Sequence, residues 1–183
     1  VSLLNWWVGQ NSRDRTICAG LYTSRLRGES WCRDEIGDQI GVIRATPGAA
    51  GEVHFSVKAL LQNWQRLDQL LIGKNGLYDK DALVPASPWL DSSRPAMPTL
   101  RVSRDPATQA LEVSWQASGK TPVWQWAVQT RVGSQWVLHI YSVPTANATF
   151  EKHADVPAIT AFAVRAISRY GIASKPAIIS IDP

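Results

Sequence analysis

The hydrophobic positions of this chain change their period near residue 98, which divides it into two parts. Before that point, stretches with helical spacing alternate with short apolar runs. The runs at Thr16–Thr23 and Glu52–Val57 predict buried strands, and the segment Trp31–Ala45 between them predicts a helix. Further helical patterns precede the first strand and follow the second, as far as Gly73. An α-β-α-β-α order with short connections predicts a parallel sheet with crossover helices.

Beyond residue 98 the period falls to two, which is the spacing of strands that are buried on one face. Seven short candidate strands follow one another, at Leu100–Val102, Leu111–Trp115, Trp124–Val128, Trp136–Ile140, Thr149–Phe150, Ile159–Ile167 and Ile178–Ile181. Turn signals such as Gly119-Lys120 and Tyr170-Gly171 separate them. The pattern predicts a β-sandwich of two antiparallel sheets, with Trp115 and Phe162 in the core between them.

Residues 77–97, between the two parts, are rich in proline, serine and aspartate, which is typical of a linker. Leu83, Pro85 and Trp89 lie within it, and a free tether would have little use for such side chains. We therefore expect the linker to pack on the helical segment Trp64–Leu71. The expected domains are residues 1–76, 77–97 and 98–183.

Tryptophan is abundant in this chain, with nine among 183 residues. Two explanations are open. An indole can stack on the apolar C–H face of a pyranose ring, and it can also fill a core with its large buried area. For the tryptophans of the second part we favour the core: Trp115, Trp124, Trp126 and Trp136.

Charge and cysteine content exclude several classes of protein. The net charge of +4 comes from scattered lysines and arginines, so no clustered basic footprint for nucleic acid is present. No apolar run approaches the ~20 residues that span a bilayer.

Cys18 and Cys32 have no partners at metal spacing and cannot define a disulfide scaffold, so we expect two unpaired, half-buried thiols. Without a phosphate loop, a nucleophile elbow or a metal cluster, we expect no cofactor and no metal.

Short motifs in both parts match known patterns. The first part and the linker carry Leu3–Trp7, Gly20–Arg25, His54–Ser56, Ala59-Leu60, Tyr78–Pro85 and Pro88–Asp91. In the second part, Leu111-x-Val113-x-Trp115 and the stretch Val164–Ser174 resemble the fibronectin type III pattern. In this order, the motifs resemble the C-terminal part of a protein of the glycosyl-hydrolase-like family ten, the former domain of unknown function 187. Members of that family run from a (β/α) barrel into a fibronectin-like domain.

The resemblance implies an α/β plus all-β fold, in which C-terminal β/α units of an incomplete TIM-type barrel precede a fibronectin type III-like β-sandwich. It also implies a bacterial cell-envelope glycoside hydrolase, periplasmic or an outer-membrane lipoprotein, that acts on glycan strands of the peptidoglycan type. A closed barrel has about eight strands, so we expect most of the barrel to lie upstream of this sequence. The catalytic carboxyl groups would lie there too, and the fragment alone would be inactive.

Candidate substrate-binding residues follow from the place of chemistry in barrels, which is the C-terminal end of the strands. On this basis we expect six residues to contact sugar: Tyr22, Ser24, Arg25, Trp31, His54 and Ser56. Tyr22 and Ser24 would share one strand face, and His54 and Ser56 another. The alternative is that Tyr22 and His54 are interior residues satisfied by their neighbours. Glu52 would precede its strand, and we expect it to stabilise the fold.

Two other functions stay open. In one, the chain is a non-catalytic module that binds carbohydrate or protein through its sandwich. In the other, the sandwich is a structural spacer. An incomplete parallel sheet also exposes strand edges, which invites pairing with another chain. Besides the glycan, we therefore expect as partner either the missing N-terminal barrel segment or a second copy that associates through these edges.

Overall fold

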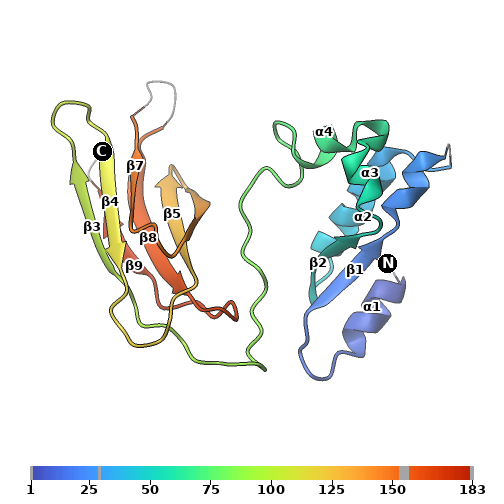
Figure 1. Cartoon of the computed structure of the whole chain (residues 1–183), viewed down its shortest axis with the longest axis horizontal. Helices are drawn as coiled ribbons and strands as arrows, with labels where there is room; N and C mark the ends of the chain where they lie inside the picture. Colours follow the sequence, from blue (N-terminus) through green and yellow to red (C-terminus); the bar gives the residue numbers. More distant parts are fainter. Residues whose placement is uncertain (1, 29, 153–156, 182–183) are drawn as a thin grey trace. The chain divides into compact units, whose positions relative to one another are not determined.

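The computed structural model describes residues 2–28, 30–152 and 157–181, and the chain forms two compact units, Val1–Lys80 and Asp81–Pro183 (Figure 1). Each unit has a hydrophobic core of its own. The outermost limits of the expected domains, at residues 1 and 183, lie outside the described residues. Within the described ranges, no helix has both the length and the hydrophobicity to span a bilayer.

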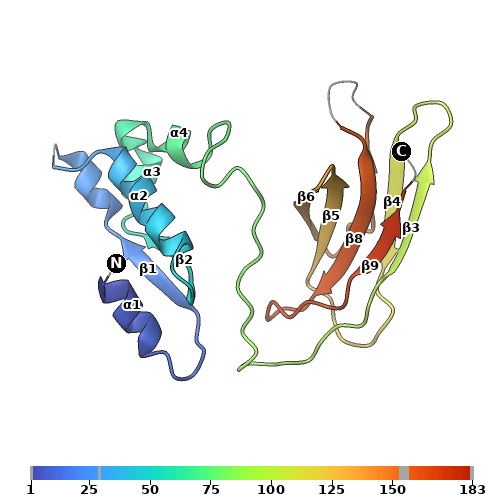
Figure 2. The same ribbon diagram turned by 180° about the vertical axis from the view of Figure 1, so that it is seen from behind.

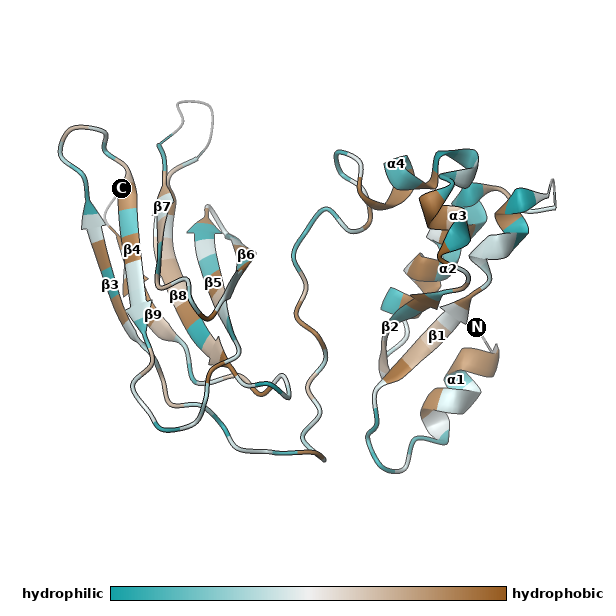
Figure 3. Cartoon of the chain, viewed as in Figure 1, coloured by the Kyte–Doolittle hydropathy of each residue, from teal (hydrophilic) through white to brown (hydrophobic). Residues whose placement is uncertain are grey.

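Two parallel strands form the centre of the first unit. β1 (Ile17–Leu21) and β2 (Ala49–His54) pair in parallel, as predicted, and α2 (Arg33–Arg44) connects them. The two opposite views show α2 against one face of the strand pair (Figure 1 and Figure 2). Figure 3 shows both hydrophobic and hydrophilic residues along α2, as in an amphipathic helix. Its buried side chains recur at helical spacing, at Ile36, Ile40 and Ile43.

The second strand begins and ends earlier than predicted, because it covers Ala49–His54 instead of Glu52–Val57. The strand begins with small residues, which lack the β-branched side chains that are typical of strands. Their backbone nevertheless pairs with β1. At its other end the chain leaves the ladder, since the Ser56 N–H donates to the Oγ atom of Ser24 at 2.9 Å. The prediction that Glu52 precedes the strand is therefore wrong, and its side chain lies within β2.

The third helical segment is broken, where the sequence predicted one amphipathic helix. It consists of α3 (Lys58–Leu61), the 3-10 turn η2 (Trp64–Arg66) and α4 (Leu67–Leu71). Asn63, Gln65 and Arg66 have φ angles of 48°, 52° and 60°, in the left-handed region that a continuous helix excludes. Two further elements complete the unit, α1 (Ser2–Gly9) before β1 and the 3-10 helix η1 (Thr23–Arg27) after it.

The second unit is the predicted β-sandwich. Its strands are β3 (Thr99–Arg104), β4 (Leu111–Gln116), β5 (Gln125–Val132), β6 (Gln135–Ser142), β7 (Asn147–Phe150), β8 (Ile159–Ile167) and β9 (Ala177–Ser180). One antiparallel sheet has the order β3-β4-β7 and the other the order β6-β5-β8-β9, a fibronectin type III-like arrangement. Trp115 and Phe162, 3% and 0% exposed, lie in the core, which confirms the predicted strand register.

Two of the four tryptophans expected in this core are exposed instead. Trp126 is 4% exposed, whereas Trp124 and Trp136 are 57% and 43% exposed. Trp136 pairs with Arg131, whose side chain lies on the outer face of the sheet. Trp124 precedes β5, so the alternation of that strand does not fix the direction of its side chain.

The linker divides between the two units. Tyr78 packs on the core of the first unit. From Asp81 onward the chain belongs to the second unit, where the Asp81 carboxylate accepts a hydrogen bond from the Ile140 N–H at 2.9 Å. The Ser87 N–H donates to the Tyr170 carbonyl at 2.8 Å. The two compact units thus meet in the chain after residue 80, while the expected domain limits and the packing of the linker's apolar side chains on residues 64–71 stay predictions.

Candidate functional site

The β1–β2 pair has two different faces. Paired residues of parallel strands point to the same side, and the register pairs Ala19 with Glu52 and Leu21 with His54. Ala19 and Leu21 belong to the core beneath α2, so Glu52 and His54 lie on this helix-covered face. The opposite face, which we call the open face, carries solvent-exposed side chains along and just beyond the strands: Cys18, Tyr22, Val53 and Phe55.

Four side chains cluster at the C-terminal ends of the two strands, and we call them the aromatic platform: Tyr22, Arg25, Trp31 and Phe55. The rings of Tyr22 and Phe55 stack with centroids 4.9 Å apart and planes 14° apart. The two residues are 45% and 48% exposed. The Cζ atom of Arg25 lies 5.8 Å from the Tyr22 ring centroid and 5.5 Å from that of Trp31. Cation–π attraction at such distances holds the guanidinium group against both rings.

Local backbone geometry brings the stacked rings together. The Phe55 N–H donates to the Leu21 carbonyl at 2.9 Å, which extends the parallel ladder past the end of β2. Gly20 leaves room for the Phe55 ring, since a Cβ atom at that position would lie 3.3 Å from Phe55 Cε1. Thr23 is fully buried, and its hydroxyl donates to the Ser56 carbonyl at 3.4 Å. The two chain segments that follow the strands are thereby fixed to each other.

Ser24 and Ser56 bond to each other, and do not share strand faces with Tyr22 and His54 as predicted. Their hydroxyl oxygens lie 3.2 Å apart, and the Ser56 N–H donates to Ser24 Oγ at 2.9 Å. The predicted alternation fails because both strands end before these serines. The serine pair joins the segments that carry Tyr22 and Phe55, and so lies next to the aromatic platform.

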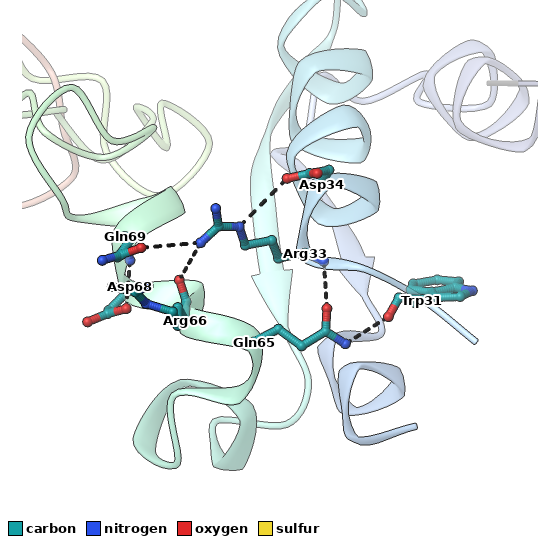
Figure 4. Close-up of polar contacts among 7 residues, drawn as sticks. All are labelled: Trp31, Arg33, Asp34, Gln65, Arg66, Asp68 and Gln69. Carbon is teal, nitrogen blue, oxygen red and sulfur yellow. Dashed lines mark hydrogen bonds and ion pairs between the residues drawn. The ribbon is translucent and has the colours of Figure 1, made fainter. Parts of the chain in front are cut away.

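The side chain of Gln65 positions the loop that carries Trp31 (Figure 4). Its Nε2 atom donates to the carbonyls of Trp31 at 2.8 Å and Leu26 at 3.0 Å, and its Oε1 atom accepts from the Arg33 N–H at 3.0 Å. Arg33 in turn donates to the Arg66 carbonyl at 3.3 Å. One amide group therefore connects η1, the start of α2 and the break between α3 and α4.

His54 lies apart from the aromatic platform, in a chain of three polar side chains on the helix-covered face. The Tyr78 hydroxyl donates to Glu52 Oε1 at 2.5 Å, and His54 Nε2 lies 2.8 Å from the same hydroxyl oxygen. Because the hydroxyl proton is directed to Glu52, the neutral imidazole carries its proton on Nε2 and donates it to Tyr78. The Nδ1 atom of His54 is then an acceptor, and it is buried without a partner among the described residues.

Burial controls the titration of this polar chain. Loss of solvation lowers the pKa of His54, and the nearby Glu52 carboxylate opposes that effect. Burial, and then the hydrogen bond to Glu52, raises the pKa of Tyr78. The Arg44 guanidinium lies 5.7 Å from the Tyr78 ring centroid and has the opposite, smaller effect. His54 and Tyr78 are therefore neutral at physiological pH.

The side chains of the aromatic platform and the serine pair are capable of stacking and hydrogen bonding. A glycosidase places two carboxyl groups ~5–9.5 Å apart across the scissile bond. Glu52 instead accepts from Tyr78 on the helix-covered face. In the parts of the chain that are described, no three acidic, His or Cys side chains are grouped to hold a metal ion. Cys18 and Cys32 are free, as predicted, but exposed where half-buried thiols were expected.

An open groove of about 870 Å³ runs along β1 between α1 and α2. Its lining is mostly hydrophobic, with two carboxylates, and includes Leu3, Leu4, Trp7, Glu35, Asp38 and Val42. In the described part of the chain β1 pairs with β2 alone, so its second edge is unpaired beside this groove.

Of the six residues expected to contact sugar, the structure brings Tyr22, Arg25 and Trp31 together in the platform. The serine pair adjoins them, whereas His54 lies elsewhere. The sequence reasoning missed Phe55, although the alternation that begins at Val53 continues to it. It also missed Gln65, for which no local pattern gives a signal.

Comparison with known proteins gives a sequence relative of defined activity class. Over 117 residues the chain is 36% identical to the glycosyl hydrolase YngK of Bacillus subtilis (strain 168). The match covers 61% of this chain but 22% of the relative, so the chain spans about a fifth of that protein's length. No family model matches the chain.

Solved structures similar to this chain include fibronectin type III domains and a glycoside hydrolase. A Fn3-like protein from Clostridium thermocellum shares 20% identity at a TM-score of 0.35, over 50% of this chain and 97% of that one. The sixth fibronectin type III domain of a human fibronectin type III domain containing protein is 22% identical at a TM-score of 0.34, and the match covers 50% of this chain and 86% of that one. The glycoside hydrolase domain of Endo-D from Streptococcus pneumoniae R6 is 20% identical at a TM-score of 0.33, and the match covers 49% of this chain and 15% of that one. The strand order described above, and not these low scores, defines the sandwich.

Proposed function

We propose that the aromatic platform binds a sugar ring of a glycan, in a protein related to glycoside hydrolases. The observation that carries this proposal is the exposed stack of Tyr22 on Phe55, with Arg25 beside it, at the C-terminal ends of two parallel strands. The exposed surface of the stacked pair suits the apolar C–H face of a pyranose, while Arg25 and the adjacent serine pair can bond to sugar hydroxyls. The similarity to a glycosyl hydrolase supports the same class of ligand.

The first unit is, in this proposal, the C-terminal portion of a (β/α)8 barrel. Its β-α-β connection is parallel, and helices cover one face of the strands. The open face would then look into the barrel, and the unpaired edge of β1 beside the groove would receive the neighbouring strand. In such a barrel the platform lies at the face where active sites are built. The greater length of the glycosyl hydrolase relative agrees with this arrangement.

The parent protein would act at the bacterial cell envelope on glycan strands of the peptidoglycan type. The family resemblance of the motifs supports this substrate class. The catalytic carboxyl groups would be supplied by the rest of the barrel, so the 183-residue chain alone would bind a glycan without cleaving it.

Titration of the purified chain with an oligosaccharide of alternating N-acetylglucosamine and N-acetylmuramic acid tests the proposal. Y22A and F55A each remove one ring of the stack, and we expect binding about two- to tenfold weaker, since an aromatic contact is worth ~0.5–1.5 kcal/mol and tenfold is ~1.4 kcal/mol. W6A removes an exposed ring of α1 in the same unit and should leave the affinity unchanged. Chemical shifts or tryptophan fluorescence report the binding.

One outcome would assign glycan binding to the sandwich instead of the platform. Trp124 is exposed there, and the Cζ atom of Arg169 lies 5.7 Å from its ring centroid. If W124A lost binding while Y22A and F55A bound like the wild type, the sandwich would be a carbohydrate-binding module and the platform would have no part in it.

A further inference from the structure

Arg25 is an exposed cation without a carboxylate partner among the residues that the structure describes. The ion pair seen in those residues joins Arg33 to Asp34 at 3.7 Å and does not involve Arg25. The guanidinium group of Arg25 instead contacts the two rings at 5.8 Å and 5.5 Å. A ring face attracts the positive charge but accepts none of the five N–H donors in the usual hydrogen-bonding sense. Among the described residues no carboxylate engages these donors, which leaves them available to a ligand there.

The two rings that hold Arg25 are themselves held in place. Tyr22 stacks on Phe55, and the loop of Trp31 is bonded to Gln65 through its carbonyl at 2.8 Å. A guanidinium group that is positioned before the ligand arrives loses less conformational freedom on binding than a free arginine does. The side chain is therefore pre-organised at the edge of a stacking surface.

We propose that Arg25 makes the platform selective for acidic sugars, because its guanidinium binds the carboxylate of a sugar whose ring stacks on the platform. The inference rests on the proposed glycan-binding function and adds the charge of the ligand to it. A carboxylate can accept two parallel N–H···O bonds from arginine, and such charge-assisted pairs are stronger than bonds to a neutral hydroxyl. Neutral sugars can still stack on Tyr22 and Phe55, but they cannot form this pair.

The test compares three forms of ligand on the 183-residue chain. They are a glycan of alternating N-acetylglucosamine and N-acetylmuramic acid, the same glycan with its carboxyl groups reduced to alcohols, and an oligomer of N-acetylglucosamine alone. We expect the acidic glycan to bind about tenfold more tightly than the other two at low salt, and the difference to shrink as salt rises. This comparison uses the wild-type protein, so it does not depend on the folding of a variant.

Substitution then assigns the selectivity to one side chain. R25Q should bind all three glycans alike, at the affinity of the reduced form, and R25K should keep only part of the preference because an ammonium lacks the paired donor geometry. R27Q is the matched control, since Arg27 lies two residues further along η1 and is also exposed. It should keep the full preference.

Failure of this inference is distinct from failure of the proposed function. If the wild type bound the acidic and reduced glycans equally well, the selectivity would be refuted and glycan binding would stand. If R27Q lost the preference as R25Q does, general charge and not Arg25 would be responsible, and the inference would be overturned. If no glycan bound, both the inference and the proposed function would fail.

Discussion

At the scale of single residues, the imidazole of His54 has one bonded nitrogen and one nitrogen without a partner in the described structure. Its Nε2 atom donates to Tyr78, whereas a proton added to the buried Nδ1 would have no acceptor there. The folded state therefore favours the neutral ring, in agreement with the lowered pKa of His54. The unfolded chain binds the proton more readily, so this group's contribution to stability is complete above a pH of about 6.5 and is lost as the pH falls below that value.

H54Q tests this linkage. Glutamine keeps an N–H donor for Tyr78 but does not titrate, so the free energy of unfolding of the variant should lack this part of the pH dependence. Between pH 8 and pH 5 we expect the wild type to lose more stability than H54Q, as measured by urea unfolding at several pH values. If the free energies of unfolding of the two proteins changed with pH in parallel, His54 would have the same proton affinity in the folded and unfolded states.

At the scale of elements, β4 shows how strictly alternation divides buried from exposed positions. Its burial alternates at each residue from Leu111 to Gln116, and Trp115 occupies the last buried position. The Nε1 atom of Trp115 is buried without a partner in the described structure, so the contribution of this side chain comes from its area and not from a hydrogen bond.

W115A should lower the free energy of unfolding of the sandwich by about 3–5 kcal/mol, because it leaves a cavity in the core. W115F should cost much less, since it keeps most of the apolar area and removes the unsatisfied N–H. W136A deletes the same kind of side chain at a position that is 43% exposed, and we expect a clearly smaller loss than for W115A, since less apolar area is buried there. Denaturant unfolding followed by circular dichroism measures all three. Equal losses for W115A and W136A would contradict the assigned faces.

The same elements show what a sequence can and cannot predict. The sandwich strands were predictable because alternation is a local signal, and the parallel pair because its apolar runs flank a helical segment. The break at Asn63, Gln65 and Arg66 was not, since it depends on left-handed backbone angles that apolar spacing does not record. In the site, Tyr22, Arg25 and Trp31 were predictable from their place after a strand. The position of His54 depended on the register of β2, and that of Gln65 on bonds to residues more than thirty positions away.

At the scale of the whole molecule, the first unit carries an open face and an unpaired strand edge, whereas the sandwich has a core enclosed between two sheets. Exposed edges of this kind present backbone donors and acceptors to other chains. We therefore expect this chain to self-associate through the first unit when no further barrel segment covers it.

C18K tests this expectation by placing a charge on the open face of β1, where burial by a second copy would then be unfavourable. Under reducing conditions, light scattering should show a mass that rises with concentration for the wild type and stays monomeric for C18K. V137K is the matched control, because Val137 is 41% exposed on a strand of the sandwich. A wild type that stays monomeric at every concentration would refute association through the first unit.

The contacts of Tyr78 also decide how the molecule would respond to mechanical tension. A pull between the two units reaches the first unit where the linker leaves it, at Leu77 and Tyr78. There Arg44 donates to the Leu77 carbonyl at 2.7 Å, and the Tyr78 hydroxyl is bonded to Glu52 inside β2. The Leu77 N–H also donates to the Leu70 carbonyl at 2.9 Å, and the Tyr78 N–H donates to the Leu71 carbonyl at 2.7 Å. These few bonds would carry the load before the backbone ladder of β1 and β2 does. Stretching would therefore first release the chain at Tyr78 and lengthen the connection, while the strand pair that supports the aromatic platform stays intact.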